Sequence, residues 1–108
     1  MTTTFDKREE GFEKQFAHDE ELQFKATARR NKMLGLWAAE KLGLSGDAAA
    51  DYSKAVVTAE IDAASDKGVV GKIMSDFAAK GISLTETDLR ARMNELLAAA
   101  VQQIKAGI

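Results

Sequence analysis

Apolar residues recur along this chain at steps of three and four, the spacing that places them on one face of an α-helix. The first strongly periodic segment runs from about Asp19 to Leu42. Gly43 follows at the place where a glycine commonly ends a helix. The predicted inward residues of this segment are Leu22, Ala26, Arg29, Met33, Leu36 and Trp37, with Phe24, Ala28 and Leu34 beside them.

Three further segments carry the same kind of pattern and are separated by short links. Their predicted limits are Ser45 or Asp47 to about Ala64, Ser65 or Asp66 to Gly81, and Thr85 onward. Their predicted inward residues are Ala48, Tyr52, Ala55, Val56, Ala59 and Ala63 in the second, Val70, Ile73, Met74 and Phe77 in the third, and Leu89, Met93, Leu96, Leu97, Ala100 and Ile104 in the fourth.

The fourth segment has the clearest start signal. Thr85 has the side chain of an N-cap, and Asp88 stands three residues later as a short version of the capping-box acid. Leu84 precedes the cap and is placed to pack onto Leu89 as a hydrophobic staple. The ion pairs predicted on the exposed side, each four residues apart, are Glu86–Arg90 and Asp88–Arg92.

Four amphipathic segments joined by short links predict an all-α fold, a small antiparallel four-helix bundle. The sequence contains no proline, which agrees with this prediction because proline breaks helix interiors. A long coiled coil is not expected, because the apolar pattern stops at Gly43 and again at Gly81. Within the bundle, Trp37, Phe77 and Leu97 lie on three different apolar faces and are expected to meet.

The N-terminal segment, residues 1–18, differs in composition from the predicted bundle over residues 19–108. Residues 1–21 contain seven acidic and three basic side chains, a net charge of −4, and few apolar ones. Such a segment has too little apolar surface to offset its ordering entropy, so we expect a mobile arm with a helical tendency. Phe5, Glu9, Phe12 and Phe16 have helical spacing. If the arm docks on the bundle, the three aromatic side chains are a satellite of the core; if it does not, they are exposed anchors, typical of an amphipathic segment that orders in the groove of a partner.

The composition excludes several kinds of chemistry. The chain has no cysteine and one histidine, so disulfides, thiolate nucleophiles and multi-histidine metal sites are excluded, and no cofactor or catalytic residue is predicted. The net charge of −2 gives no general attraction to nucleic acid. The N-terminal residues lack the basic start and apolar core of a signal peptide, and no apolar run is long enough to span a membrane. The absence of both features favours a protein of the cytoplasm, or of its equivalent, the mitochondrial matrix, that is not inserted in the membrane.

Four basic residues, Lys25, Arg29, Arg30 and Lys32, fall within eight positions without an acidic residue among them. One hypothesis is a patch that binds an anion, such as the phosphates of an adenine nucleotide. The alternative is a solvated helix face whose long side chains pack their stems on the bundle. The positions spread around the helix instead of following one edge, which favours the second interpretation.

Two motifs then point to a known family. The segments Phe16-Ala17-His18-Asp19 and Ala28-Arg29-Arg30-Asn31-Lys32 resemble those of the zeta subunit of alphaproteobacterial F-type ATP synthases. The resemblance covers the whole chain and is strongest from Phe5 to Gly43. It implies a four-helix bundle with a mobile N-terminal inhibitory segment.

This resemblance also implies a function. Zeta subunits bind the catalytic head of the ATP synthase, contact its alpha, beta and gamma subunits, and block ATP hydrolysis without being enzymes. That association implies a cytoplasmic location peripheral to the inner membrane. The inhibitory segment would run from Thr2 to about His18, and Gly11 departs from the family pattern, which weakens its helix by about 1 kcal/mol relative to alanine. The pattern positions carried over are Phe5, Asp6, Arg8, Glu9, Phe12, Glu13 and Phe16, followed by His18 at the end.

Overall fold

The computed structural model describes the backbone of residues 2–63 and 65–107 and the side chains of residues 20–61 and 65–107. The described residues form four helices, which confirms the predicted all-α fold. These helices are α1 (Thr2–Lys41), α2 (Gly46–Ala63), α3 (Asp66–Ala79) and α4 (Glu86–Lys105).

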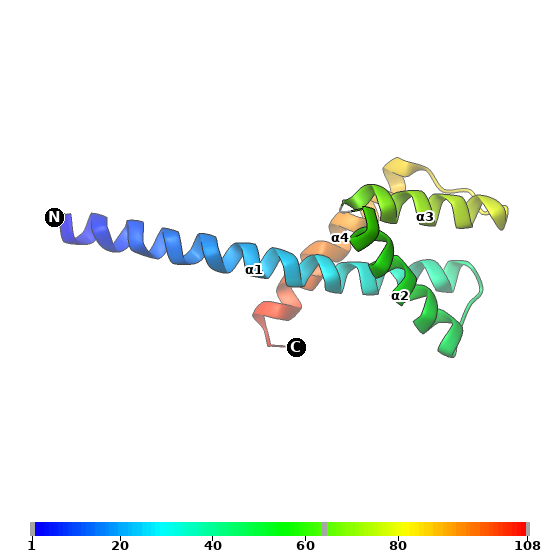
Figure 1. Ribbon diagram of the computed structural model, residues 1–108, viewed down its shortest axis with the longest axis horizontal. Coiled ribbons are helices and arrows are strands. Elements are labelled where there is room, and N and C mark those ends of the chain that lie inside the picture. The colour runs from blue at the N-terminus through cyan, green and yellow to red at the C-terminus, as the bar shows by residue number, and fades with distance from the viewer. Residues whose placement is uncertain (1, 64, 108) are drawn as a thin grey trace.

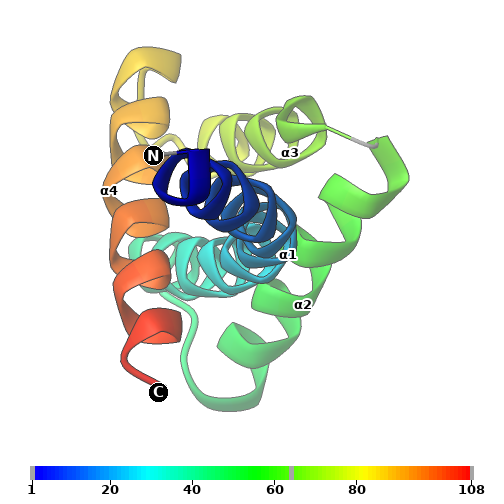
Figure 2. The same ribbon diagram turned by 90° about the vertical axis from the view of Figure 1, so that its left-hand side faces the viewer.

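The long helix α1 determines the shape of the molecule, whose extents are 63 × 26 × 22 Å. Its C-terminal half is packed between α2 and α4, which cross it obliquely on either side, while α3 packs against α2 and α4 (Figures 1 and 2). Its N-terminal half extends beyond the other three helices (Figure 1). The helix therefore begins at Thr2, ahead of the start near Asp19 that the apolar pattern indicates.

The predicted helix ends are confirmed at several positions. Ser65 is the N-cap of α3, where its side chain accepts a hydrogen bond from the backbone N–H of Lys67. Thr85 is the N-cap of α4, and its hydroxyl oxygen accepts from the N–H of Asp88 at 3.0 Å. After α1, Gly43 has a φ of 81°, a left-handed conformation that favours glycine and ends the helix.

The core lies where the four helices meet. Its largest fully buried apolar side chains are Leu34 from α1, Val56 from α2, Val69 and Ile73 from α3, and Leu89 from α4. The predicted contact between Trp37 and Phe77 is confirmed, with ring centroids 5.9 Å apart and the rings stacked. Leu97 does not join them, because it is half-buried and lies outside this core cluster.

The inward face predicted for α1 is wrong in part. Phe24 and Leu36 were expected on or beside it, yet they are 78% and 43% exposed. The buried side chains instead include a row at steps of four, with Asn31 and Ala39 buried beside it. The row consists of Leu22, Ala26, Arg30, Leu34 and Ala38 of α1 and Leu42 directly after α1. The physical reason is that Arg30 finds carboxylate partners inside the bundle, so a polar residue occupies the inward face that an apolar count assigns elsewhere.

One of the two predicted ion pairs on α4 is present. The Nε of Arg90 lies 3.1 Å from a carboxylate oxygen of Glu86, as the spacing predicts. The predicted Asp88–Arg92 pair does not form. Arg92 pairs instead with Glu95 at 3.1 Å and lies over the ring of Trp37, 5.5 Å from its centroid, where the indole face attracts the guanidinium.

Replacing Leu97 by alanine is expected to lower the free energy of unfolding by about 1 kcal/mol. Full burial would predict a loss of about 2–5 kcal/mol, but a half-buried leucine forfeits less contact and leaves no closed cavity. Urea denaturation of the variant beside the wild type measures the difference. A loss above about 2 kcal/mol would contradict the half-buried position of Leu97.

Candidate functional site

The N-terminal half of α1 is the first candidate site. Its backbone is helical from Thr2 and extends away from the other helices (Figure 1). The side chains of the predicted partner-binding residues lie outside the part of the chain whose side chains the structure describes. These residues are Phe5, Asp6, Arg8, Glu9, Phe12, Glu13, Phe16 and His18.

The four basic residues of the second candidate site point to different surroundings. The ammonium of Lys25 lies 3.1 Å from a carboxylate oxygen of Glu21, on the exposed surface. Arg29 donates to the side-chain oxygen of Gln103 on α4 at 3.4 Å. Lys32 is exposed, whereas Arg30 is 4% exposed and lies inside the bundle. The structure therefore does not gather the four cations on one surface.

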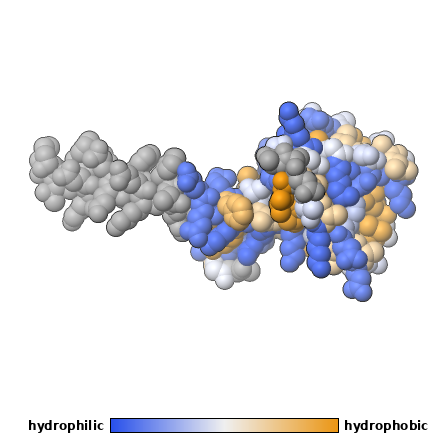
Figure 3. All heavy atoms as spheres, in the orientation of Figure 1, coloured by the Kyte–Doolittle hydropathy of each residue, from blue (hydrophilic) through white to orange (hydrophobic). Residues whose placement is uncertain are grey.

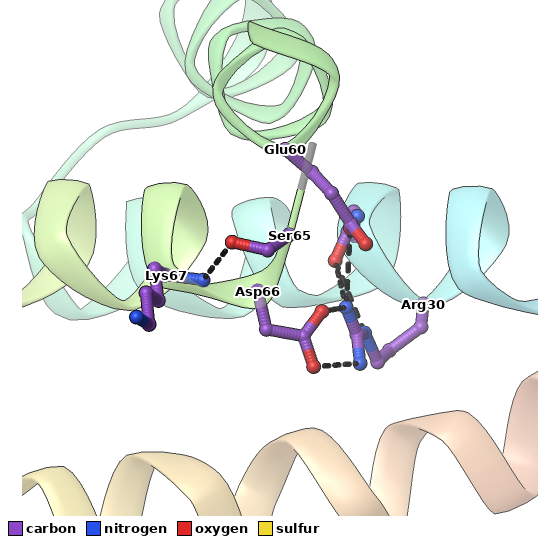
Figure 4. Close-up of polar contacts among 6 residues, drawn as sticks. Arg30, Glu60, Ser65, Asp66 and Lys67 are labelled. Carbon is purple, nitrogen blue, oxygen red and sulfur yellow. Dashed lines mark hydrogen bonds and ion pairs between the residues drawn. The ribbon is translucent and has the colours of Figure 1, made fainter. Parts of the chain in front are cut away.

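Arg30 is the centre of a polar network that joins three helices (Figure 4). Its NH2 group donates to Asp66, the first residue of α3, at 2.8 Å and to Glu60 of α2 at 3.2 Å. Its Nε and NH2 groups also donate to the amide oxygen of Asn31 at 3.0 and 2.8 Å. This arrangement fixes the end of α2 and the start of α3 against the middle of α1.

The pKa values of the two carboxyl groups that contact Arg30 are shifted in opposite directions. Hydrogen bonds from the Arg30 guanidinium hold the pKa of Asp66 below its ordinary value of 3.8. Burial raises the pKa of Glu60 above its ordinary value of 4.5 by more than the Arg30 charge lowers it, and the nearby Asp66 charge adds to the rise. Asp66 is therefore the main anionic partner of the buried guanidinium.

Replacing Asp66 by asparagine is expected to lower the free energy of unfolding by about 1 kcal/mol at about pH 7, since Asp66 is 43% exposed and its ion pair is partly screened. Because the pKa of Asp66 is lowered, its stabilising contribution is present above about pH 3.8 and is lost as the pH falls through the lowered value. The difference in the free energy of unfolding between variant and wild type should therefore shrink towards about pH 2. Urea denaturation across this pH range measures it.

The control for this prediction is Glu60→Gln. The raised pKa of Glu60 means that its contribution is present below about pH 4.5 and is lost as the pH rises through the raised value. Burial disfavours the ionised form of Glu60, whereas Arg30 favours the ionised form of Asp66, so near neutral pH Glu60→Gln is expected to lose less stability than Asp66→Asn. The reverse order of the two losses would contradict the assignment of Asp66 as the main partner.

A second polar cluster joins α2 to α3 and does not include Arg30. The hydroxyl of Tyr52 donates to a carboxylate oxygen of Asp76 at 2.8 Å, and the ammonium of Lys72 lies 3.2 Å from the same oxygen. Lys72 also lies 4.8 Å from the centre of the Tyr52 ring. Burial raises the pKa of Tyr52, and the hydrogen bond to Asp76 adds to the rise, so the phenol stays protonated and acts as a donor.

Two further kinds of site, a metal centre and a membrane-spanning helix, are absent from the part of the chain that the structure describes. No group of three or more His, Cys, Asp or Glu side chains is arranged around a possible ion among the residues whose side chains are described. Within that same part of the chain, no helix is both long enough and apolar enough to cross a bilayer.

Sequence reasoning missed the partners of Arg30. It assigned Asp66 only as a possible helix cap and gave Glu60 no role, because the two residues are 36 and 30 positions away from Arg30 in the chain. The available signal was the position of Arg30, which follows the predicted inward residue Arg29 directly and lies four residues after Ala26. A cation at such a position indicates buried acidic partners.

Comparison with known proteins extends these observations. A family model described as ATPase inhibitor subunit zeta matches residues 1–103. A protein with a solution NMR structure is 41% identical to this chain with a TM-score of 0.69, and the similarity covers 81% of this chain and 99% of that one. No curated protein matches the chain. The family match thus includes both the projecting part of α1 and the four-helix region.

Proposed function

Since this chain belongs to the family of the ATPase inhibitor subunit zeta, a family of regulatory subunits and not of enzymes, we propose that its N-terminal segment, residues 2–18, inhibits ATP hydrolysis by an F-type ATP synthase. The segment enters a gap between the alpha and beta subunits of the catalytic head, beside the gamma subunit. The observation that carries the proposal is the family match, which begins at residue 1 and therefore includes this segment.

The shape of α1 supports this mechanism. One helix of 40 residues contains both the segment and the residues that pack into the bundle, so a force on one end is transmitted to the other. The backbone of residues 2–18 extends past α2, α3 and α4, which leaves it accessible to a partner (Figure 1). The bundle then anchors the C-terminal half of α1 and so fixes the direction in which the segment projects.

The chemistry of the segment fits a cleft between subunits. On a helix, the spacing of Phe5, Phe12 and Phe16 places the three rings on one side, where they are anchors for an apolar groove. The surrounding acidic residues remain at the rim, where charges affect the association rate more than the final affinity. A helix held in such a gap blocks the rotation of the central shaft.

The alternative function is the binding of an adenine nucleotide or another small anion by Lys25, Arg29, Arg30 and Lys32. In this structure an incoming phosphate would compete with Glu21 for Lys25 and with Asp66 and Glu60 for Arg30. Titration of the protein with ATP in a calorimeter measures this affinity. A dissociation constant in the millimolar range or weaker would disfavour nucleotide binding as the function and leave inhibition of the ATPase as the better supported one.

The proposal is tested by adding the purified chain to the cognate ATPase head and measuring ATP hydrolysis. We expect hydrolysis to fall progressively as the concentration of the chain rises. When the chain is captured on a resin, we expect the ATPase head to be captured with it. Unchanged hydrolysis, with no head captured, would contradict both the function and the partner.

A further inference from the structure

The three most exposed large apolar side chains among the described residues lie on one face, where α1 and α2 meet. Phe24 is 78% exposed, Ile61 is 72% exposed and Leu36 is 43% exposed. Figure 3 shows apolar surface between hydrophilic side chains near the end of α2 and the neighbouring part of α1. Neither the core nor the polar network on Arg30 uses these three side chains.

Two hollows lie on this face and share Val57. The first has a volume of about 350 Å³ and is lined by Phe24, Ala28 and Ile61 among others. The second has a volume of about 710 Å³ and is lined by Leu36 together with Lys32 and Lys54. Because both hollows run between α1 and α2 and meet at Val57, they form one surface, which we call the α1–α2 groove.

The charges on the α1–α2 groove are unbalanced. Lys32 and Lys54 line the second hollow and are exposed, and neither has an ion-pair partner among the residues that the structure describes. The carboxylate in the first hollow, Glu60, is already held by Arg30 at 3.2 Å. The groove therefore presents apolar side chains beside two cations that a partner carboxylate can satisfy.

We infer that the α1–α2 groove docks an amphipathic helix of the ATPase head that carries apolar side chains flanked by carboxylates. The inference rests on the proposed function, because it takes the head as the partner. Apolar hollows receive the anchors of such a helix, and Lys32 and Lys54 pair with its acidic residues. The groove begins at Gln23, about one turn of α1 beyond the inhibitory segment, so a head that holds the segment meets the groove next.

This docking surface has a role distinct from that of the inhibitory segment. The segment reaches into the gap, while the groove adds a second contact through the same rigid helix. Two linked contacts bind more tightly than either alone, because the second forms at a high effective concentration. Loss of the groove contact should therefore weaken binding of the full chain to the head.

The test measures the affinity of the full chain for the cognate ATPase head after single changes in the groove. Phe24→Ser and Lys54→Glu are each expected to weaken binding about tenfold, and the effect of Lys54→Glu should diminish as salt is raised. Both positions are exposed, so circular dichroism should show unchanged folding. The matched control is Lys80→Glu, which changes an exposed lysine at the C-cap of α3, outside the groove, and should leave the affinity unchanged.

The outcomes separate this inference from the proposed function. If the wild-type chain binds and inhibits the head while both groove variants bind as tightly as it does, the docking surface is wrong and the function stands. If the wild type itself neither binds nor inhibits, the proposed function fails first. A dimer of the free chain that Phe24→Ser dissociates would also overturn the inference, since a second copy would then occupy the groove.

Discussion

Replacing Gly35 by alanine is expected to lower the free energy of unfolding by about 3 kcal/mol, although alanine is the better helix former. Gly35 is buried where α1 crosses α2. A Cβ atom there would lie 2.5 Å from the Cα of Ser53, a backbone atom that no side-chain rotation can move away. The two helices would have to separate, which would stretch the hydrogen bond of 2.7 Å from the Ser53 hydroxyl to the carbonyl oxygen of Lys32.

The control is the same substitution at Gly71. This glycine is inside α3, is exposed and has no atom within 4 Å of the position that a Cβ would take. Alanine there should raise the free energy of unfolding by about 0.5–1 kcal/mol, because glycine weakens a helix interior. Urea denaturation of both variants shows whether each substitution raises or lowers the free energy of unfolding. Similar effects at Gly35 and Gly71 would contradict the close crossing of α1 and α2.

The helix ends could be predicted because they depend on local chemistry. The N-caps Ser65 and Thr85 and the glycine Gly43 each act on atoms a few residues away, so a short window of sequence contains their whole cause. The contact of Trp37 with Phe77 was predicted on a different ground, because large apolar side chains on the inward faces of helices gather in one core, but the same argument wrongly placed Leu97 with them.

The inward face of α1 could not be predicted in the same way. Counting apolar residues favoured Leu36 and placed Phe24 beside the face, whereas the fold buries Arg30 and Asn31. Burial of Arg30 depends on Asp66, the first residue of α3, which reaches Arg30 only after the chain has passed through the whole of α2. A contact over 36 positions has no signature in the local pattern, so both the Arg30 network and the α1–α2 groove emerge only in three dimensions.

Deleting residues 2–16 is expected to abolish inhibition of the cognate ATPase while the bundle stays folded. The first buried side chain that the structure describes is Leu22, so the described core lies entirely beyond the deletion. The deletion removes the predicted anchors Phe5, Phe12 and Phe16. Replacing these three by alanine should have much of the same effect, since truncating an interface aromatic often costs about 2 kcal/mol or more, and about 1.4 kcal/mol is tenfold in affinity.

The full chain with Lys80→Glu is a suitable control for these variants, because its change is exposed and lies far along the chain from the inhibitory segment. Circular dichroism and thermal unfolding should show that the deleted chain, the triple alanine variant and the control keep their helices. A deletion that unfolds the bundle would show that residues 2–16 belong to the folded core instead of forming a separate effector.

Residues 2–18 are proposed to carry the inhibition. This assignment is tested by titrating the cognate head in parallel with the full chain and with the chain lacking residues 2–16, while ATP hydrolysis is measured. The full chain should reduce hydrolysis as its concentration rises, and the deleted chain should leave hydrolysis unchanged at the same concentrations. Equal inhibition by the two chains would contradict the claim and would assign the effect to the four-helix region.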